Sequence, residues 1–170
     1  MKNLKEEKFY EDDEFYSIIE DILGNTHFNK LKTIRHHGIT RFNHSLRVSY
    51  YTFKTTKKLG LNYVEATRAA LLHDFFTDEV KEQKMSDALK NHPSVALMNA
   101  KKYFDISDLQ ADIIVKHMFP VTKELPKYKE SWIVDVIDDV SSVYERTYSL
   151  NSEFQAALNF IFIILLIKIR

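Results

Sequence analysis

Residues that interrupt helices are scarce in this chain, which has three glycines and three prolines among 170 residues. Proline lacks a backbone donor and glycine favours turns, so a chain poor in both is expected to be mostly helical. Cysteine is absent, which excludes disulfide scaffolds, cysteine zinc sites and thiol nucleophiles. The three glycines cannot form a phosphate-binding loop or a dinucleotide-binding fingerprint. The composition therefore predicts a mostly helical chain, and the spacing of apolar residues along it predicts an all-α fold of about six to eight helices.

Apolar residues recur at helical spacing along most of the chain. The predicted helices run over about 15–23, 40–59, 63–76 and 133–144, with others beginning at Pro93, after Ser107 and after Ser152. Pro93 is placed at the first position of its helix, where proline is favoured. Ser107 with Gln110 matches a capping box. No repeat, linker or low-complexity segment divides the chain, so we expect one domain over residues 1–170.

Charge and hydropathy restrict the partners of the protein. Basic and acidic residues each number 24, which argues against a nucleic-acid or anionic-membrane partner. The charged first eight residues lack a secretory core, and we expect a cytoplasmic protein. The apolar run 160–167 is far shorter than the roughly 20 residues of a membrane span. We expect the segment 152–170 to pack on the core or to form a homodimer interface, with membrane attachment and an edge strand as alternatives.

The candidate chemistry lies in histidines and aspartates placed among apolar residues. Neutral imidazole and carboxylate suit Mn, Fe, Co, Ni or Zn. His73 and Asp74 follow one another within an apolar stretch, where a charged group is seldom buried unless it is paired or bound to metal. The pattern alone leaves open whether such residues form an interior cluster or are incidental. The candidates are His44, His73, Asp74, His92, His117 and Asp138.

The order His44, His73-Asp74, Asp138 resembles the H…HD…D signature of the HD-domain superfamily of metal-dependent phosphohydrolases. The similarity covers about residues 36–145, most of the chain. The resemblance implies a helical bundle in which these four residues hold a divalent transition metal.

His92 and His117 resemble the additional histidines of members that hold two metals. The resemblance implies that they complete a second site, with Asp74 bridging the two. It also implies that a metal-bridging hydroxide attacks phosphorus in line, which makes Asp74 a catalytic residue as well as a ligand.

The sequence departs from the common family pattern at three positions. Phe75-Phe76-Thr77 stands where many members have a Gly-Lys pair soon after the dyad, and Asp139 stands where a lysine commonly follows the final aspartate. Met118 replaces the second histidine of some cyclic-dinucleotide phosphodiesterases. Because of these departures, the resemblance does not define the substrate class or the occupancy of the second metal site.

Three residues are candidates to bind substrate. Arg41 and Arg47 flank His44 at helical spacing and are suited to bidentate phosphate binding, with pairing to local acids as the alternative. His37, just ahead of this helix, is a candidate substrate contact or general acid, and a solvated loop residue is its alternative.

Four functions follow from these observations. The favoured one is a phosphomonoesterase or phosphodiesterase acting on a small phosphorylated metabolite, with a nucleotide as the preferred class. A di-iron oxygenase is the second, because a minority of HD-type proteins use the same ligands for oxygen chemistry. The missing Gly-Lys pair motivates a third, a catalytically silent domain that senses a nucleotide. A helical interaction module with incidental histidines is the fourth.

Overall fold

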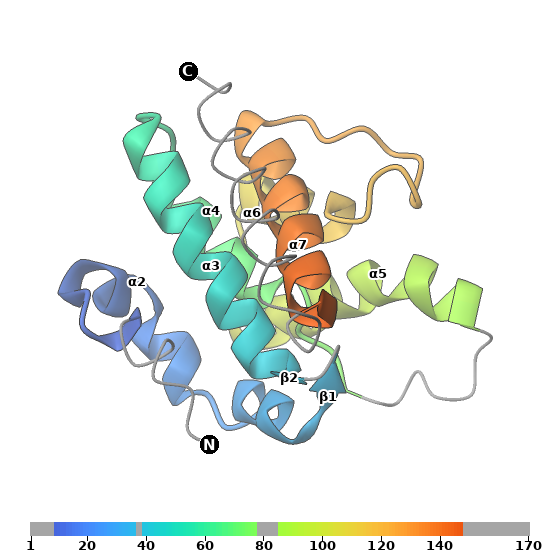
Figure 1. Ribbon diagram of the computed structural model, residues 1–170, viewed down its shortest axis with the longest axis horizontal. Helices are drawn as coiled ribbons and strands as arrows, with labels where there is room; N and C mark the ends of the chain where they lie inside the picture. Colours follow the sequence, from blue (N-terminus) through green and yellow to red (C-terminus); the bar gives the residue numbers. More distant parts are fainter. Residues whose placement is uncertain (1–8, 37–38, 78–84, 148–170) are drawn as a thin grey trace.

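A computed structural model describes residues 9–36, 39–77 and 85–147, and helices dominate this part (Figure 1). The prediction of an all-α bundle is confirmed. Two antiparallel strands of two residues each precede α3, and the sequence did not predict them. The elements are α2 (Asp13–Gly24), the 3-10 helix η1 (Phe28–Thr33), β1 (Arg35–His36), β2 (Ile39–Thr40), α3 (Arg41–Lys58), α4 (Tyr63–Leu72), α5 (Met85–Tyr103), α6 (Asp108–Lys116) and α7 (Lys129–Thr147).

Helix α3 lies at the centre of the bundle, where it packs against α4 and α7 (Figure 1). Helix α4 also contacts α6, and α6 contacts α5 and α7. Small residues on α4, Ala66, Ala69 and Ala70, are fully buried, which allows neighbouring helices to approach closely. The helices that carry the candidate residues are therefore all joined to one core.

Polar side chains define where several helices begin. Thr40, Asn62 and Ser107 each accept a hydrogen bond from the backbone N–H three residues later, at the starts of α3, α4 and α6. Both hydrogen bonds of the capping box predicted from Ser107 and Gln110 are present. Such caps satisfy backbone donors that a helix leaves open, and each stabilises its helix by about 1 kcal/mol.

Two predicted helix boundaries are wrong. Pro93 lies inside α5, which already begins at Met85, so its missing N–H leaves one carbonyl in the preceding turn without its helical donor. Helix α4 ends at Leu72 rather than at residue 76. There the His73 ring takes the carbonyl of Ala70 as its acceptor and the Phe75 N–H takes that of Leu72, which turns the chain out of the helix.

Some expectations fall on residues outside the described part. These are the substrate role of His37, the helix predicted after Ser152, and the packing or dimerisation of the segment 152–170. Within the described residues, no helix has both the length and the apolar character required to cross a membrane.

Candidate metal centre

The six candidate ligand side chains meet inside the bundle, and all of them are buried. They come from five helices or the turns that end them. His44 is in the first turn of α3, His73 and Asp74 follow α4, His92 is in α5, His117 follows α6, and Asp138 is in α7. Residues up to 94 positions apart in sequence, from position 44 to position 138, therefore share one interior site.

Two histidines are oriented by the ends of their own helices. The Nδ1 atoms of His73 and His117 lie 2.7 and 2.8 Å from the carbonyl oxygens of Ala70 and Ile114. A carbonyl oxygen only accepts hydrogen bonds, so each Nδ1 carries the proton and donates it. In the neutral rings the Nε2 atoms are therefore unprotonated, as metal ligation requires.

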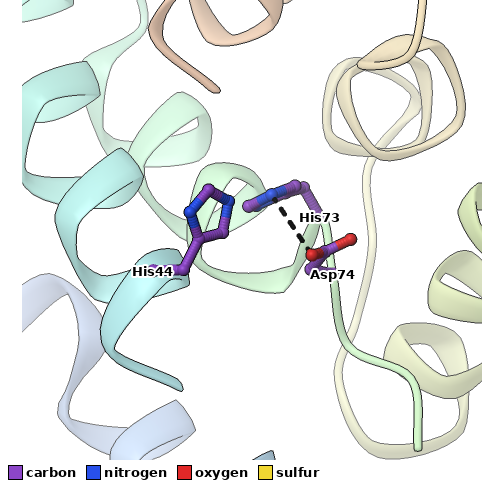
Figure 2. Close-up of side chains that lie close together, drawn as sticks. All are labelled: His44, His73 and Asp74. Carbon is purple, nitrogen blue, oxygen red and sulfur yellow. Dashed lines mark ion pairs between the residues drawn. The ribbon is translucent and has the colours of Figure 1, made fainter. Parts of the chain in front are cut away.

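The first half of the site lies between α3, α7 and the end of α4. His44 Nε2 is 2.8 Å from Asp138 Oδ1, and His73 Nε2 is 3.6 Å from the same oxygen. Figure 2 shows His44 reaching from α3 toward His73 and Asp74, whose Oδ2 is 4.0 Å from His73 Nε2. The His73 Nε2 atom is buried without a hydrogen-bond partner. A buried imidazole nitrogen without a hydrogen-bond partner fits a role as a metal ligand.

The second half is grouped around Oδ1, the other oxygen of the Asp74 carboxylate. Asp74 Oδ1 is 3.5 Å from His92 Nε2 and 3.9 Å from His117 Nε2, and these two nitrogens are 3.0 Å apart. Asp74 therefore directs one oxygen toward His73 and the other toward His92 and His117.

The donor set fits a divalent transition metal. Three overlapping groups of three residues have ligand atoms within 4.8 Å of one another. Nitrogen and carboxylate oxygen donors without thiolate suit Mn, Fe, Co, Ni and Zn. The groups are His44, His73 and Asp74; His73, His117 and Asp138; and Asp74, His92 and His117.

The charged groups of the first half shift one another's pKa values. Burial would lower the pKa of His44, but hydrogen bonds to Asp138 and Glu145 outweigh it and raise that pKa to about 10. Burial likewise opposes the charged form of His73, yet the charges of Asp138 and Asp74 raise its pKa. The same histidines hold the pKa of Asp138 well below its usual range despite burial. In this half the aspartates favour their ionised form, and His44 and His73 favour their protonated form.

The second half behaves differently. Burial would raise the pKa of Asp74, but the surrounding histidines, His73 and His92 foremost, lower it. Burial, followed by the charge of His73, lowers the pKa of His117 to about 4. His117 is therefore neutral at physiological pH, with an Nε2 lone pair available.

Sequence reasoning missed Glu145, whose side chain has no exposed surface. Glu145 Oε2 accepts from His44 Nδ1 at 2.9 Å, and Oε1 accepts from Arg47 Nη1 at 2.5 Å. The signal available in the sequence is its place seven residues after Asp138, which puts both carboxylates on one face of α7. Reading that signal requires knowing that this face packs against α3.

The two candidate arginines each contact a buried carboxylate: Arg41 contacts the candidate ligand Asp74, and Arg47 contacts Glu145. Arg41 Nη1 donates to the carbonyl of Phe76 at 2.8 Å, and its Nε is 3.7 Å from Asp74 Oδ2. Its guanidinium also lies 3.7 Å from the centre of the Phe76 ring. Arg47 is ion-paired with Glu145. Each arginine therefore lies beside an acid, which was the alternative to phosphate binding for both residues.

Asp135, one turn before Asp138 on α7, is expected to destabilise the folded protein at neutral and higher pH. Its Oδ1 is buried without a hydrogen-bond partner. Burial, followed by the charge of Asp139, raises the pKa of Asp135 from 3.8 to about 7. The folded state therefore favours the protonated form, and stability falls as the pH rises from about 4 through 7.

The substitution Asp135→Asn should remove this effect. We expect about 1–2 kcal/mol of added stability at pH 8, allowing for solvent screening, and none near pH 4. Thermal unfolding across this pH range measures it. Asp112→Asn is the matched control, because Asp112 is hydrogen-bonded to Lys116 and Ser131, so its removal should destabilise at pH 8. An Asp135→Asn variant less stable than wild type at pH 8 contradicts the prediction.

Comparison with known proteins identifies a matching family model and a relative that matches over part of the chain. A family model described as "HD domain" matches residues 41–142. An ACT domain-containing protein of Staphylococcus haemolyticus (strain JCSC1435) is 27% identical over 79 residues, covering 46% of this chain and 52% of that protein. The match thus spans about half the length of this curated relative. No solved structure matches the chain significantly.

Proposed function

The chain belongs to the HD-domain family, and from this premise we propose that it is a metal-dependent phosphohydrolase acting on a small phosphorylated metabolite, with a nucleotide as the preferred class. The observation that carries the proposal is the position of the Asp74 carboxylate. Its two oxygens approach different histidines: Oδ2 lies 4.0 Å from His73 Nε2, and Oδ1 lies 3.5 Å from His92 Nε2. One carboxylate between two nitrogen sets favours a two-metal site.

In this proposal His44, His73, Asp74 and Asp138 hold one divalent ion, and Asp74, His92 and His117 hold a second. Such ions, when bound, lower the pKa of water and offset negative charge on phosphoryl oxygens.

The residues of the chain prepare the site for this role. Asp74 stays ionised across the physiological range, because the neighbouring histidines lower its pKa. His73 and His117 keep their Nε2 atoms directed inward through bonds from Nδ1 to backbone carbonyls. Burial of all six side chains limits access of bulk water to the site, which strengthens charge interactions there.

Two residues are proposed to contact the substrate. Arg41 reaches the site beside Asp74, and a guanidinium there is suited to a phosphate oxygen. We propose it as a substrate contact, together with His37. The balance of 24 basic and 24 acidic residues favours a small substrate over a charged polymer.

A substrate panel tests the proposed function. The full chain, freed of metal with a chelator and reloaded separately with Mn²⁺, Co²⁺, Ni²⁺, Fe²⁺, Zn²⁺ or Mg²⁺, is assayed for phosphate release from nucleoside monophosphates, cyclic nucleotides and sugar phosphates. We expect release that depends on a transition metal and is lost on chelation. Oxygen consumption that requires ferrous iron, without phosphate release, would instead support the oxygenase. Nucleotide binding without turnover under any metal would support the sensor.

A further inference from the structure

We infer that Glu145, held by Arg47, is a positioning residue that fixes the ring of His44 with Nε2 directed at the metal site. The inference rests on the proposed metal centre, since it assigns a role to a residue that supports one of its ligands. Glu145 is not itself within the groups of potential ligands among the described residues.

The three side chains form a continuous chain of contacts between α3 and α7. Arg47 Nη1 donates to Glu145 Oε1 at 2.5 Å, and Glu145 Oε2 lies 2.9 Å from His44 Nδ1. An ionised carboxylate only accepts hydrogen bonds, so His44 Nδ1 must carry the proton. The nitrogen on the opposite side of the ring, Nε2, is then the ligand atom of the neutral histidine, and it is the one that faces Asp138 at 2.8 Å.

The position of His44 in its helix explains why it needs this partner. His73 and His117 directly follow α4 and α6, where carbonyls of the last turn are open to their Nδ1 atoms. His44 is the fourth residue of α3, where the carbonyls three and four residues back already accept hydrogen bonds from backbone N–H groups of the helix. Its Nδ1 therefore takes a carboxylate from another helix, as metal-ligating histidines often do.

The burial of Glu145 supports a specific role. An ionised carboxylate without exposed surface is costly unless its oxygens are fully paired. Arg47 pairs with one oxygen and balances the charge, while the other oxygen remains directed at His44. Asp138 and Glu145 lie on the same face of α7, so this face presents one carboxylate to each nitrogen of the His44 ring.

The inference is tested on the full chain by zinc binding and by histidine NMR. Zinc affinity is measured by competition with a chromophoric chelator for wild type, Glu145→Gln and the control Asp112→Asn. Asp112 is also a buried carboxylate paired with a basic side chain, Lys116. Its partners among the described residues are Lys116, Lys127 and Ser131, none of which is a candidate ligand. We expect the Kd for Zn²⁺ to rise about 10- to 100-fold in Glu145→Gln and to stay at the wild-type value in Asp112→Asn.

The second readout is which nitrogen of the His44 ring carries the proton. If Glu145 and Arg47 formed only a structural ion pair, they would not fix this position. In the zinc-loaded, ¹⁵N-histidine-labelled wild type, two-bond ¹H–¹⁵N correlations should show His44 protonated at Nδ1 and not at Nε2. A proton on Nε2 overturns the inference, even if Glu145→Gln does not fold. A folded Glu145→Gln with wild-type affinity also overturns it, while wild-type zinc binding leaves the proposed metal centre standing. Absence of zinc binding in wild type would overturn both.

Discussion

Replacing Asp74 with asparagine is expected to abolish metal-dependent phosphate release and to weaken binding in both halves of the site. The amide cannot bridge two ions as a carboxylate does, and it removes the negative charge that faces His73, His92 and His117. Loss of a residue that only supports a metal ligand costs about 10- to 100-fold in affinity or activity. Loss of the shared ligand should therefore cost at least about 100-fold in kcat/KM.

A comparison with His92→Gln makes this prediction specific. His92 Nε2 lies 3.5 Å from Asp74 Oδ1, among the residues proposed to hold the second ion, so its removal should weaken binding of the second ion more than that of the first. Phosphate release and bound metal per chain, measured after desalting, follow both effects. If Asp74→Asn and His92→Gln lose the same single equivalent of metal, Asp74 is not a shared ligand.

Metal addition is expected to raise the melting temperature strongly, and the gain should grow with pH. At 100 times the Kd, a metal that binds only the folded chain adds about 2.7 kcal/mol. For a chain of this length this is about 5–10 °C in Tm. The ion competes with protons on His44 and His73, whose pKa values are raised, so binding releases protons and strengthens as the pH rises.

The metal-free protein should show the opposite trend. The folded-state pKa of His44, about 10 against an ordinary 6.5, contributes stability that is fully present below about pH 6.5 and is lost as the pH rises through 10. Scanning calorimetry with chelator and with Mn²⁺ between pH 6.5 and 8.5 measures both trends. A metal-induced gain in Tm that shrinks with increasing pH contradicts the account.

Much of the site could be predicted because its ligands are marked by local context. His73 and Asp74 lie among apolar residues. The order of His44, the His73-Asp74 pair and Asp138 along the chain resembles one family, and this resemblance indicated which side chains lie together. The structure brings these side chains together with His92 and His117. Whether they hold metal is a prediction for experiment.

The features that sequence reasoning missed depend on long-range packing or on side-chain competition for the backbone. Glu145 gains its place only through the pairing of α7 with α3. The early end of α4 depends on the His73 ring taking the carbonyl of Ala70. The start of α5 at Met85, before Pro93, shows that a favoured first-turn residue is tolerated within a helix. The place of Glu145 is not encoded in any short window of sequence, because His44 lies 101 residues before it.

Anomalous diffraction from crystals of the metal-reconstituted protein tests the central claim most directly. Data collected at the absorption edge of the added metal, such as Mn or Zn, locate the ions without assumption. The account predicts a peak in contact with His44, His73, Asp74 and Asp138, and a second peak, at full or partial occupancy, in contact with Asp74, His92 and His117. Absence of a peak at Asp74, with metal found only at exposed carboxylates, would contradict it.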